Sequence, residues 1–214
     1  DTHEMDREGY RANGPDRCFH CKTELFERLA SLAQDEGWQS VAYGAATDVL
    51  GDVRPGMDAA RAGAVRAPLL EAGIGKLEVR ILARMVGLPV WDKPQSACLA
   101  SRIPHGSEVT PANLRQVEAG GAWVRARYGL RVVRLRHRGR PARIEVSAED
   151  IGLLSRPEAL DAISLQMNSL GFISVEIDPA GYRRPDPLPA AASDGGPEGV
   201  PSFSQTEVSR GSSG

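Results

Sequence analysis

The sequence has no long apolar run, few aromatic residues and only three cysteines among its 214 residues. A membrane-spanning helix needs about 20 consecutive apolar residues, so no such span is expected. The first four residues, Asp-Thr-His-Glu, lack the basic-then-apolar pattern of a secretory signal. An odd and small number of cysteines excludes a disulfide scaffold and favours a reduced, cytoplasmic protein.

Excess charge of either sign is also missing. The 26 basic residues nearly balance the 28 acidic ones, which leaves a formal net charge of −2. That balance argues against a nucleic-acid-binding protein, although it does not exclude a local basic patch that binds nucleic acid. The common phosphate-loop, dinucleotide, zinc-protease and hydrolase motifs are absent as well. The length is compatible with one or two domains.

The first half of the chain has the pattern of an α/β unit. Apolar residues recur at helical spacing after Pro15 and Asp16, and a short apolar run then predicts a buried strand. The expected elements are a lead-in loop at 1–14, a helix at 15–37, a strand at 41–43, a loop at 44–57, a helix at 77–85 and a long loop at 88–110.

The second half predicts a compact α+β unit in the order α-β-β-α-α-β. Thr110 and Pro111 form a helix start, although Gly120 and Gly121 weaken the middle of that helix. Alternating residues on both sides of Gly139 predict a hairpin. The expected elements are a helix at 110–127, strands at 132–136 and 142–146, helices from 147 and at 157–170, and a strand at 172–177.

Cys18 and Cys21 form a C-x-x-C motif at the start of the first long helix. The spacing places both sulfurs on one helical face, and a helix N-terminus favours thiolates. The motif is compatible with a redox dithiol, half of a zinc site, part of an iron–sulfur cluster, or two buried cysteines that only pack. As a fourth zinc ligand, His20 is poorly placed and His105 is a weak candidate.

The long loop carries the third cysteine, Cys98, close to Ser101 and Arg102. A neighbouring arginine lowers the pKa of a thiol and binds phosphate, so Cys98 is a candidate nucleophile, with an inert exposed thiol as the alternative.

In the hairpin, Arg134 and Arg136 alternate with apolar residues and share one face. Two such arginines suit a phosphate or nucleotide, or they form a solvated strand face.

Six motifs, taken in order, resemble the LarE family of ATP-dependent sulfur transferases, which belong to the PP-loop ATP-pyrophosphatase superfamily. The resemblance runs from about residue 5 to residue 184. The motifs are NGPDRCFHCK (13–22), DVRPG (52–56), APLLE (67–71), KLEVR (76–80), GLPVWDKP (87–94) and ACLASRIP (97–104).

The resemblance implies an enzyme that uses ATP and Mg²⁺ to adenylate a pyridinium dicarboxylate mononucleotide. The enzyme then installs sulfur to give the thiocarboxylates of the nickel-pincer nucleotide cofactor of lactate racemase. It also implies a small nucleotide substrate and a homo-oligomer. ATP is needed because a carboxylate is a poor electrophile, whereas an acyl adenylate has a good leaving group.

The resemblance also assigns roles to individual residues. Cys98 matches the sulfur-donating cysteine, which in some members becomes dehydroalanine. In members that also have the C-x-x-C motif, three cysteines hold a [4Fe–4S] cluster, so Cys18, Cys21 and Cys98 are expected to do so here. The residues that match substrate-phosphate contacts, or lie near them, are Ser101, Arg102, Arg134, Arg136 and Glu145.

Two departures from the family pattern concern ATP. The S-G-G-x-D-S loop is absent, so the chain is expected to begin about a third of the way into the family's length and not to bind ATP productively. Residues 44–49, GAATDV, stand where the family has G-T-N-x-D-D.

The expected fold class is therefore α/β. Residues 1–107 form the C-terminal part of a Rossmann-like, adenine-nucleotide alpha-hydrolase-like PP-loop domain, residues 108–184 an α+β substrate-phosphate domain, and residues 185–214 a disordered tail. Two alternatives stay open: a PP-loop enzyme that thiolates tRNA, and a catalytically inactive metal-binding remnant.

Overall fold

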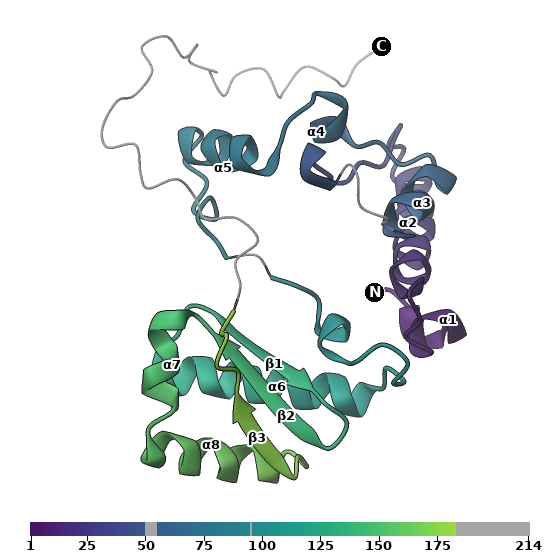
Figure 1. The fold of residues 1–214 in the computed structure, drawn as a ribbon. Coiled ribbons are helices and arrows are strands. Elements are labelled where there is room, and N and C mark those ends of the chain that lie inside the picture. Colours follow the sequence, from purple (N-terminus) through teal and green to yellow (C-terminus); the bar gives the residue numbers. More distant parts are fainter. Residues whose placement is uncertain (50–54, 95, 183–214) are drawn as a thin grey trace. The chain divides into compact units, whose positions relative to one another are not determined.

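A computed structural model describes residues 1–49, 55–94 and 96–182 and shows a mixed α/β protein (Figure 1). The expected disordered tail at 185–214 and part of the motif at 52–56 lie outside the described residues. The elements of the first half, with 3₁₀ helices written as η, are η1 (Glu4–Asp6), α1 (Glu8–Arg11), α2 (Arg17–Asp35), η2 (Thr47–Val49), α3 (Pro55–Ala62), α4 (Pro68–Glu71), α5 (Lys76–Met85) and η3 (Leu99–Arg102).

The second half confirms the predicted element order. A three-stranded sheet has the order β1-β2-β3, in which β1 and β2 form the predicted antiparallel hairpin and β3 joins β2 in parallel. The elements are α6 (Pro111–Tyr128), β1 (Val133–His137), β2 (Pro141–Val146), α7 (Ala148–Leu154), α8 (Pro157–Ser169) and β3 (Ser174–Ile177).

One face of this sheet is buried and the other is polar. Leu135 and Ile144, which are paired across the hairpin, are fully buried together with Ile163 and Met167 of α8. Figure 1 shows α6 running behind the strands, and Val124 of that helix joins the same core. Because side chains alternate along a strand, the residues between the buried ones point to the opposite face.

Gly120 explains why α6 can lie so close to the sheet. A Cβ atom there would fall well inside van der Waals distance of Leu135 Cδ2 and 3.1 Å from Met167 Sδ. The N-terminus of α6 is nevertheless capped on both sides. Asn113 N donates to Thr110 Oγ1 at 3.2 Å, and Thr110 N donates to Asn113 Oδ1 at 2.9 Å. The glycines that weaken α6 in isolation therefore serve its packing.

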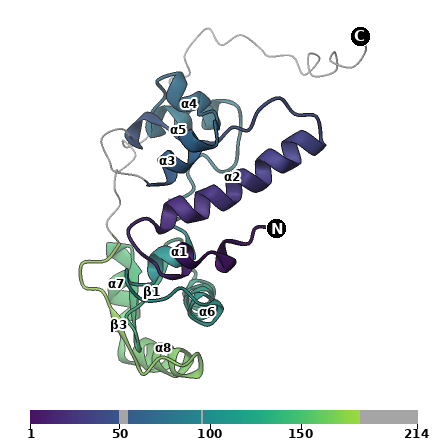
Figure 2. The ribbon, with the colours of Figure 1, turned by 90° about the vertical axis from the view of Figure 1, so that its right-hand side faces the viewer.

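In the first half, α3 packs against α2, as Figures 1 and 2 both show. Phe26 of α2 is buried against Ala59 and Ala60 of α3. The predicted helix at 15–37 is confirmed. Leu32 is nonetheless 53 % exposed, so the apolar stripe is buried only over its N-terminal part.

Three expectations for the first half differ from the structure. Residues 1–14 are not a frayed lead-in, because η1 and α1 form there and Tyr10 is buried. The predicted loop at 44–57 is interrupted by η2 and ends early, because α3 begins at Pro55. The predicted strand at 41–43 is reduced to one parallel bridge between Ala42 and Arg66.

The helix predicted at 77–85 is confirmed as α5, but none of its residues is buried. Its apolar side chains recur at helical spacing and are 44–49 % exposed: Leu77, Ile81, Leu82 and Met85. No helix within the described residues combines the length and the apolar character needed to cross a membrane.

We predict that Gly120→Ala destabilises the protein, because overpacking against Leu135 outweighs the gain in helix propensity. The expected loss is about 1–2 kcal/mol in the free energy of unfolding, measured by urea denaturation. Gly152→Ala in α7 is the matched control, because no atom lies within 4 Å of a Cβ there. Equal stabilisation by both substitutions would contradict the packing argument.

Candidate functional site

The buried carboxamide of Asn13 joins the N-terminal segment to the loop that carries Cys98. Its Nδ2 atom donates to the carbonyl oxygens of Pro104 at 2.7 Å and Ser107 at 2.8 Å, and Asn13 is fully buried. The backbone of Asn13 has a φ of 56°, in the left-handed region that asparagine tolerates better than most residues. The Asn-Gly-Pro turn at 13–15 therefore marks a residue that ties two distant segments together. We call Asn13 and its buried hydrogen bonds the hub.

Arg17, at the start of α2, extends this hub. Its Nη1 atom donates to Asn13 Oδ1 at 2.5 Å and to the carbonyl oxygen of Ala100 at 2.8 Å, and the side chain is only 4 % exposed. Ala100 belongs to η3 and lies between Cys98 and Arg102. The Arg17 side chain thus links the helix that bears Cys18 and Cys21 to the segment that bears Cys98.

The three cysteines are free and differ in burial. Cys18 and Cys98 are exposed, whereas Cys21 is partly buried against a small core formed by Tyr10, Ala100 and Val109. Burial raises the pKa of the Cys21 thiol, and the charges of Glu4, Cys98 and Cys18 raise it further, while Lys22 opposes them. Cys18 and Cys98 therefore both lie close enough to Cys21 to act on its thiol electrostatically.

Their placement does not form a ready-made metal site. Among the described residues, no three side chains of His, Cys, Asp or Glu are positioned to hold one ion together. The two histidines weighed as further ligands have other contacts: His20 Nε2 lies 3.0 Å from Asp16 Oδ2, and His105 Nδ1 lies 3.2 Å from the carbonyl oxygen of Asn13. As placed, the cysteines do not fit a cluster.

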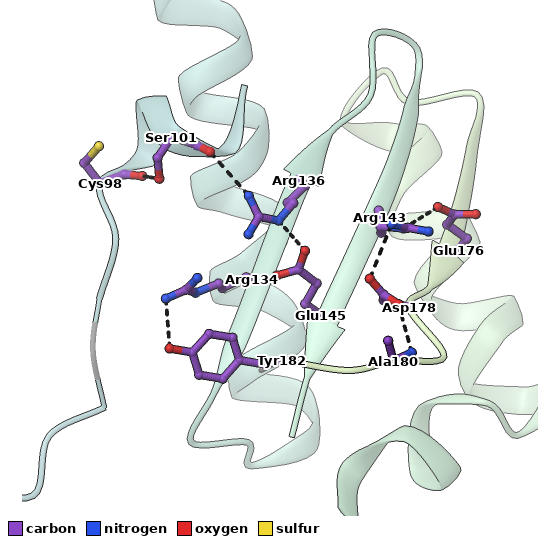
Figure 3. A network of polar contacts seen from close by, with 10 residues as sticks. All are labelled: Cys98, Ser101, Arg134, Arg136, Arg143, Glu145, Glu176, Asp178, Ala180 and Tyr182. Carbon is purple, nitrogen blue, oxygen red and sulfur yellow. Dashed lines mark hydrogen bonds and ion pairs between the residues drawn. The ribbon is translucent and has the colours of Figure 1, made fainter. Parts of the chain in front are cut away.

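The polar face of the sheet lies next to the Cys98 segment (Figure 3). Arg134 of β1 is paired across the hairpin with Glu145, and Arg136 forms an ion pair with the same glutamate. Arg136 Nη1 also lies 3.4 Å from the carbonyl oxygen of Ser101. Ser101 Oγ donates to the carbonyl oxygen of Cys98 at 2.7 Å, which fixes the turn into η3.

Arg134 and Arg143 differ in their surroundings on that face. The Arg134 guanidinium stacks on the Tyr182 ring at 4.1 Å, and its Nη2 donates to Tyr182 Oη at 3.0 Å. Arg143 instead lies between two carboxylates, with 2.6 Å to Glu176 and 3.4 Å to Asp178. The charge of Arg143 is therefore matched within the sheet.

Arg102 is the most buried arginine next to the polar face of the sheet, with 9 % of its surface exposed. Burial lowers the pKa of its guanidinium, and the positive charges of Arg125, Arg134 and Arg136 lower it further, while Cys98 opposes them. Arg102 lines two cavities. One of about 310 Å³ includes Ser101, Arg136 and Glu145. The other, of about 320 Å³, includes Arg125 and Arg134.

The structure thus brings Cys98, Ser101, Arg102, Arg136 and Glu145 together around η3. Arg134 lies on the same strand face but lines a different cavity from Arg136. Sequence reasoning missed Asn13, Arg17 and Arg125 as site residues. Of these three, only Asn13 had a signal in the sequence, the Asn-Gly-Pro turn. Arg17 and Arg125 cannot be told apart from the other residues of an arginine-rich sequence.

The exposed thiol of Cys98 and the arginines around η3 thus lie on neighbouring segments of the chain. No protein-family profile matches the chain. The chain is 40 % identical over 182 residues to an uncharacterized protein of a Synechocystis species, a match that covers 85 % of this chain and 68 % of that protein.

It is also 35 % identical over 173 residues to the pyridinium-3,5-bisthiocarboxylic acid mononucleotide synthase of Lactiplantibacillus plantarum, which covers 80 % of this chain and 61 % of that enzyme. An uncharacterized protein of Methanocaldococcus jannaschii is 26 % identical over 171 residues, a match that covers 80 % of this chain and 66 % of that protein. The chain spans about two thirds of the length of these curated relatives. It belongs to the LarE family.

We predict that Asn13→Gly destabilises the protein by about 2–4 kcal/mol, because several buried hydrogen bonds are lost and Arg17 loses a partner. Glycine keeps the left-handed backbone free of strain, so the loss reports on the carboxamide together with the greater freedom of glycine in the unfolded chain. Asn168→Ala on the exposed face of α8 is the control and should change stability by less than about 0.5 kcal/mol. Chemical denaturation measures both, and equal effects would refute the role of Asn13 as a hub.

Proposed function

We propose that this chain is the sulfur-transferring part of an ATP-dependent, LarE-like sulfur transferase. Its substrate would be an adenylated pyridinium dicarboxylate mononucleotide, which it converts to the thiocarboxylate for the nickel-pincer cofactor of lactate racemase. The observation that carries the proposal is the exposed thiol of Cys98 beside Arg102 and the polar face of the sheet. The named Lactiplantibacillus plantarum relative, a bisthiocarboxylic acid mononucleotide synthase, supports the same substrate class.

The proposed reaction uses Cys98 as a nucleophile. The thiolate attacks the acyl carbon of the adenylate, AMP leaves with the bonding electron pair, and a thioester forms. Loss of the Cys98 α-proton to a base then breaks the Cβ–S bond, which releases the thiocarboxylate and leaves dehydroalanine.

A [4Fe–4S] cluster on Cys18, Cys21 and Cys98 is the other proposed route for sulfur. The electrostatic influence of Cys18 and Cys98 on the Cys21 thiol supports their closeness to it, but no step is assigned to a cluster because the cysteines as placed do not form a metal site. Measuring iron and acid-labile sulfide in anaerobically purified protein separates the two routes.

The substrate phosphate is proposed to bind at the polar face of the sheet. Ser101, Arg102, Arg134 and Arg136 would contact it, and Glu145 would hold Arg136 in position through their ion pair. Guanidinium groups suit this role because they donate paired hydrogen bonds to phosphate oxygens.

We further propose that residues 1–107 are the C-terminal part of a PP-loop ATP-binding domain, in which ATP and Mg²⁺ would bind. The parallel bridge between Ala42 and Arg66 and the exposed apolar side chains of α5 support an α/β layer that is not completed by these residues. Residues 108–184 would form the substrate-phosphate domain. A homo-oligomer remains a prediction.

We predict that Cys98→Ala lowers thiocarboxylate formation from the pre-formed acyl adenylate about 100-fold or more, because the nucleophile is gone. Mass spectrometry should show loss of one hydrogen sulfide from Cys98 in the reacted wild-type protein. Cys18→Ser is the matched control: it keeps activity if Cys98 gives up its own sulfur, and loses activity together with iron if a cluster operates. Full activity of the Cys98 variant would overturn the proposal.

We predict that Arg134→Gln weakens binding of a pyridine mononucleotide about tenfold, because one charge-assisted contact to phosphate is lost. Arg143→Gln removes a guanidinium from the same sheet face, where Glu176 and Asp178 already match its charge, and should leave affinity within about twofold. Isothermal titration calorimetry measures both. Equal weakening by the two variants would show that the effect is general charge and not a phosphate contact.

A further inference from the structure

His137, the last residue of β1, has no role in the proposed reaction. Its ring is partly buried and packs against Phe172, a member of the core under the sheet, with 5.3 Å between the ring centroids. Both ring nitrogens have hydrogen-bond partners. Nδ1 lies 3.1 Å from Gly139 N in the hairpin turn, and Nε2 lies 3.2 Å from Gln116 Oε1 of α6. The ring thus joins the hairpin turn to α6.

These partners determine the protonation state of His137. The backbone N–H of Gly139 can only donate, so Nδ1 must accept, and the proton of the neutral ring is on Nε2. That Nε2 donates to Gln116 Oε1, and Gln116 Nε2 donates to the carbonyl oxygen of Leu170 at 2.7 Å. The hydrogen bonds therefore run in one direction, from the hairpin turn to the end of α8. Only the neutral imidazole in this tautomer satisfies all of them.

The segment between α8 and β3 is closely fitted to this network. Gly171 has a φ of 95°, and a Cβ atom there would lie 3.0 Å from Gln116 Nε2. A glycine therefore serves both the backbone conformation and the close approach of the carboxamide. The hairpin turn is tied to the same segment, because the carbonyl oxygen of Arg140 accepts from Ile173 N at 3.1 Å. The network thus connects the hairpin turn, α6 and the entry into β3.

The surroundings of His137 disfavour a positive charge on its ring. Burial lowers the pKa of the imidazole below its usual value of 6.5. Arg136 precedes it on the opposite face of the strand, and Arg138 follows it as an exposed side chain. Among the described residues, no carboxylate forms an ion pair with the ring. The residues that face it from α6, β2 and the segment after α8 are uncharged: Gln116, Ala142 and Phe172.

We infer that His137 is a pH-sensitive latch, which in its neutral form holds the hairpin turn at 138–140 and releases it on protonation. When Nδ1 takes a proton from solvent, both ring nitrogens carry N–H donors, and one of them faces the N–H of Gly139. That hydrogen bond is then lost. The bond to Gln116 stays, because Nε2 donates in both states. His137 and Arg136 line the same cavity, so the released turn adjoins one of its walls. The inference does not rest on the proposed sulfur transfer.

NMR spectroscopy of the ¹⁵N-labelled wild-type chain is the first test. In mildly alkaline buffer, the imidazole nitrogen shifts should show the proton of His137 on Nε2. On acidification, His137 should titrate with a midpoint below 6.5. The amide proton of Gly139 should shift upfield with the same midpoint, because it loses its acceptor. A proton on Nδ1 in alkaline buffer, or a Gly139 signal that does not follow the titration of His137, would overturn the inference.

Gln116→Glu tests the direction of the effect. A carboxylate beside Nε2 favours the imidazolium, so the pKa of His137 should rise and the Gly139 transition should move to higher pH with it. His3→Gln, which removes an exposed histidine, is the control and should leave both unchanged. Circular dichroism confirms that the variants are folded. A Gly139 transition that stays in place while the pKa of His137 moves would refute the latch.

The pH dependence of stability gives an independent measurement. Because the pKa of His137 is lower in the folded than in the unfolded chain, the unfolded chain binds the proton first. The stabilisation is therefore complete above about pH 6.5 and decreases as the pH falls toward the folded pKa. Urea denaturation should show this decrease in the wild-type chain and a smaller one in His137→Gln. The same decrease in both would count against the latch.

Discussion

The fully buried carboxamide of Asn13 is the interaction on which the site depends. One side chain holds the carbonyl groups that follow η3 and also accepts a hydrogen bond from Arg17, which reaches back to Ala100 within η3. The residues it joins are about 90 positions apart in the sequence. Without that hub, the Cys98 segment would keep its contacts with α6 and β1 but lose its tie to the helix that bears Cys18 and Cys21.

The second constraint is the conflict between burial and charge around Arg102. Alternation along β1 places Leu135 in the core and Arg134 and Arg136 on the opposite face, where η3 brings a further arginine. Several guanidinium groups so close together repel one another, and burial makes that repulsion stronger. The ion pair of Arg136 with Glu145 offsets part of this repulsion. What remains is a surface that an anionic substrate would stabilise.

Much of the second half could be predicted from the sequence because its signals are local. The Thr110 cap and the alternation on both sides of Gly139 each identify an element by short-range chemistry. The same alternation predicted that Arg134 and Arg136 lie on one face of the sheet. Arg125 could not be predicted as part of a cavity, because its position depends on how closely α6 approaches the strands.

The first half was harder for a physical reason. Its contacts are made between distant segments, as with Asn13 and Ser107, and such contacts leave no periodic trace in the sequence. Short helices such as α1 are stabilised by burial of single residues, here Tyr10, more than by propensity. The strand at 41–43 had the right composition, yet within the described residues it finds only the segment at Arg66 to pair with.

Tyr182 contributes to the polar face of the sheet from beyond the last strand. The last strand ends at Ile177, and the hydrophobic core is complete by then. Yet the backbone of Tyr182 is tied to Val146, and its ring covers the guanidinium of Arg134. A chain trimmed at the last strand would lose both this backbone tie and the ring that covers Arg134.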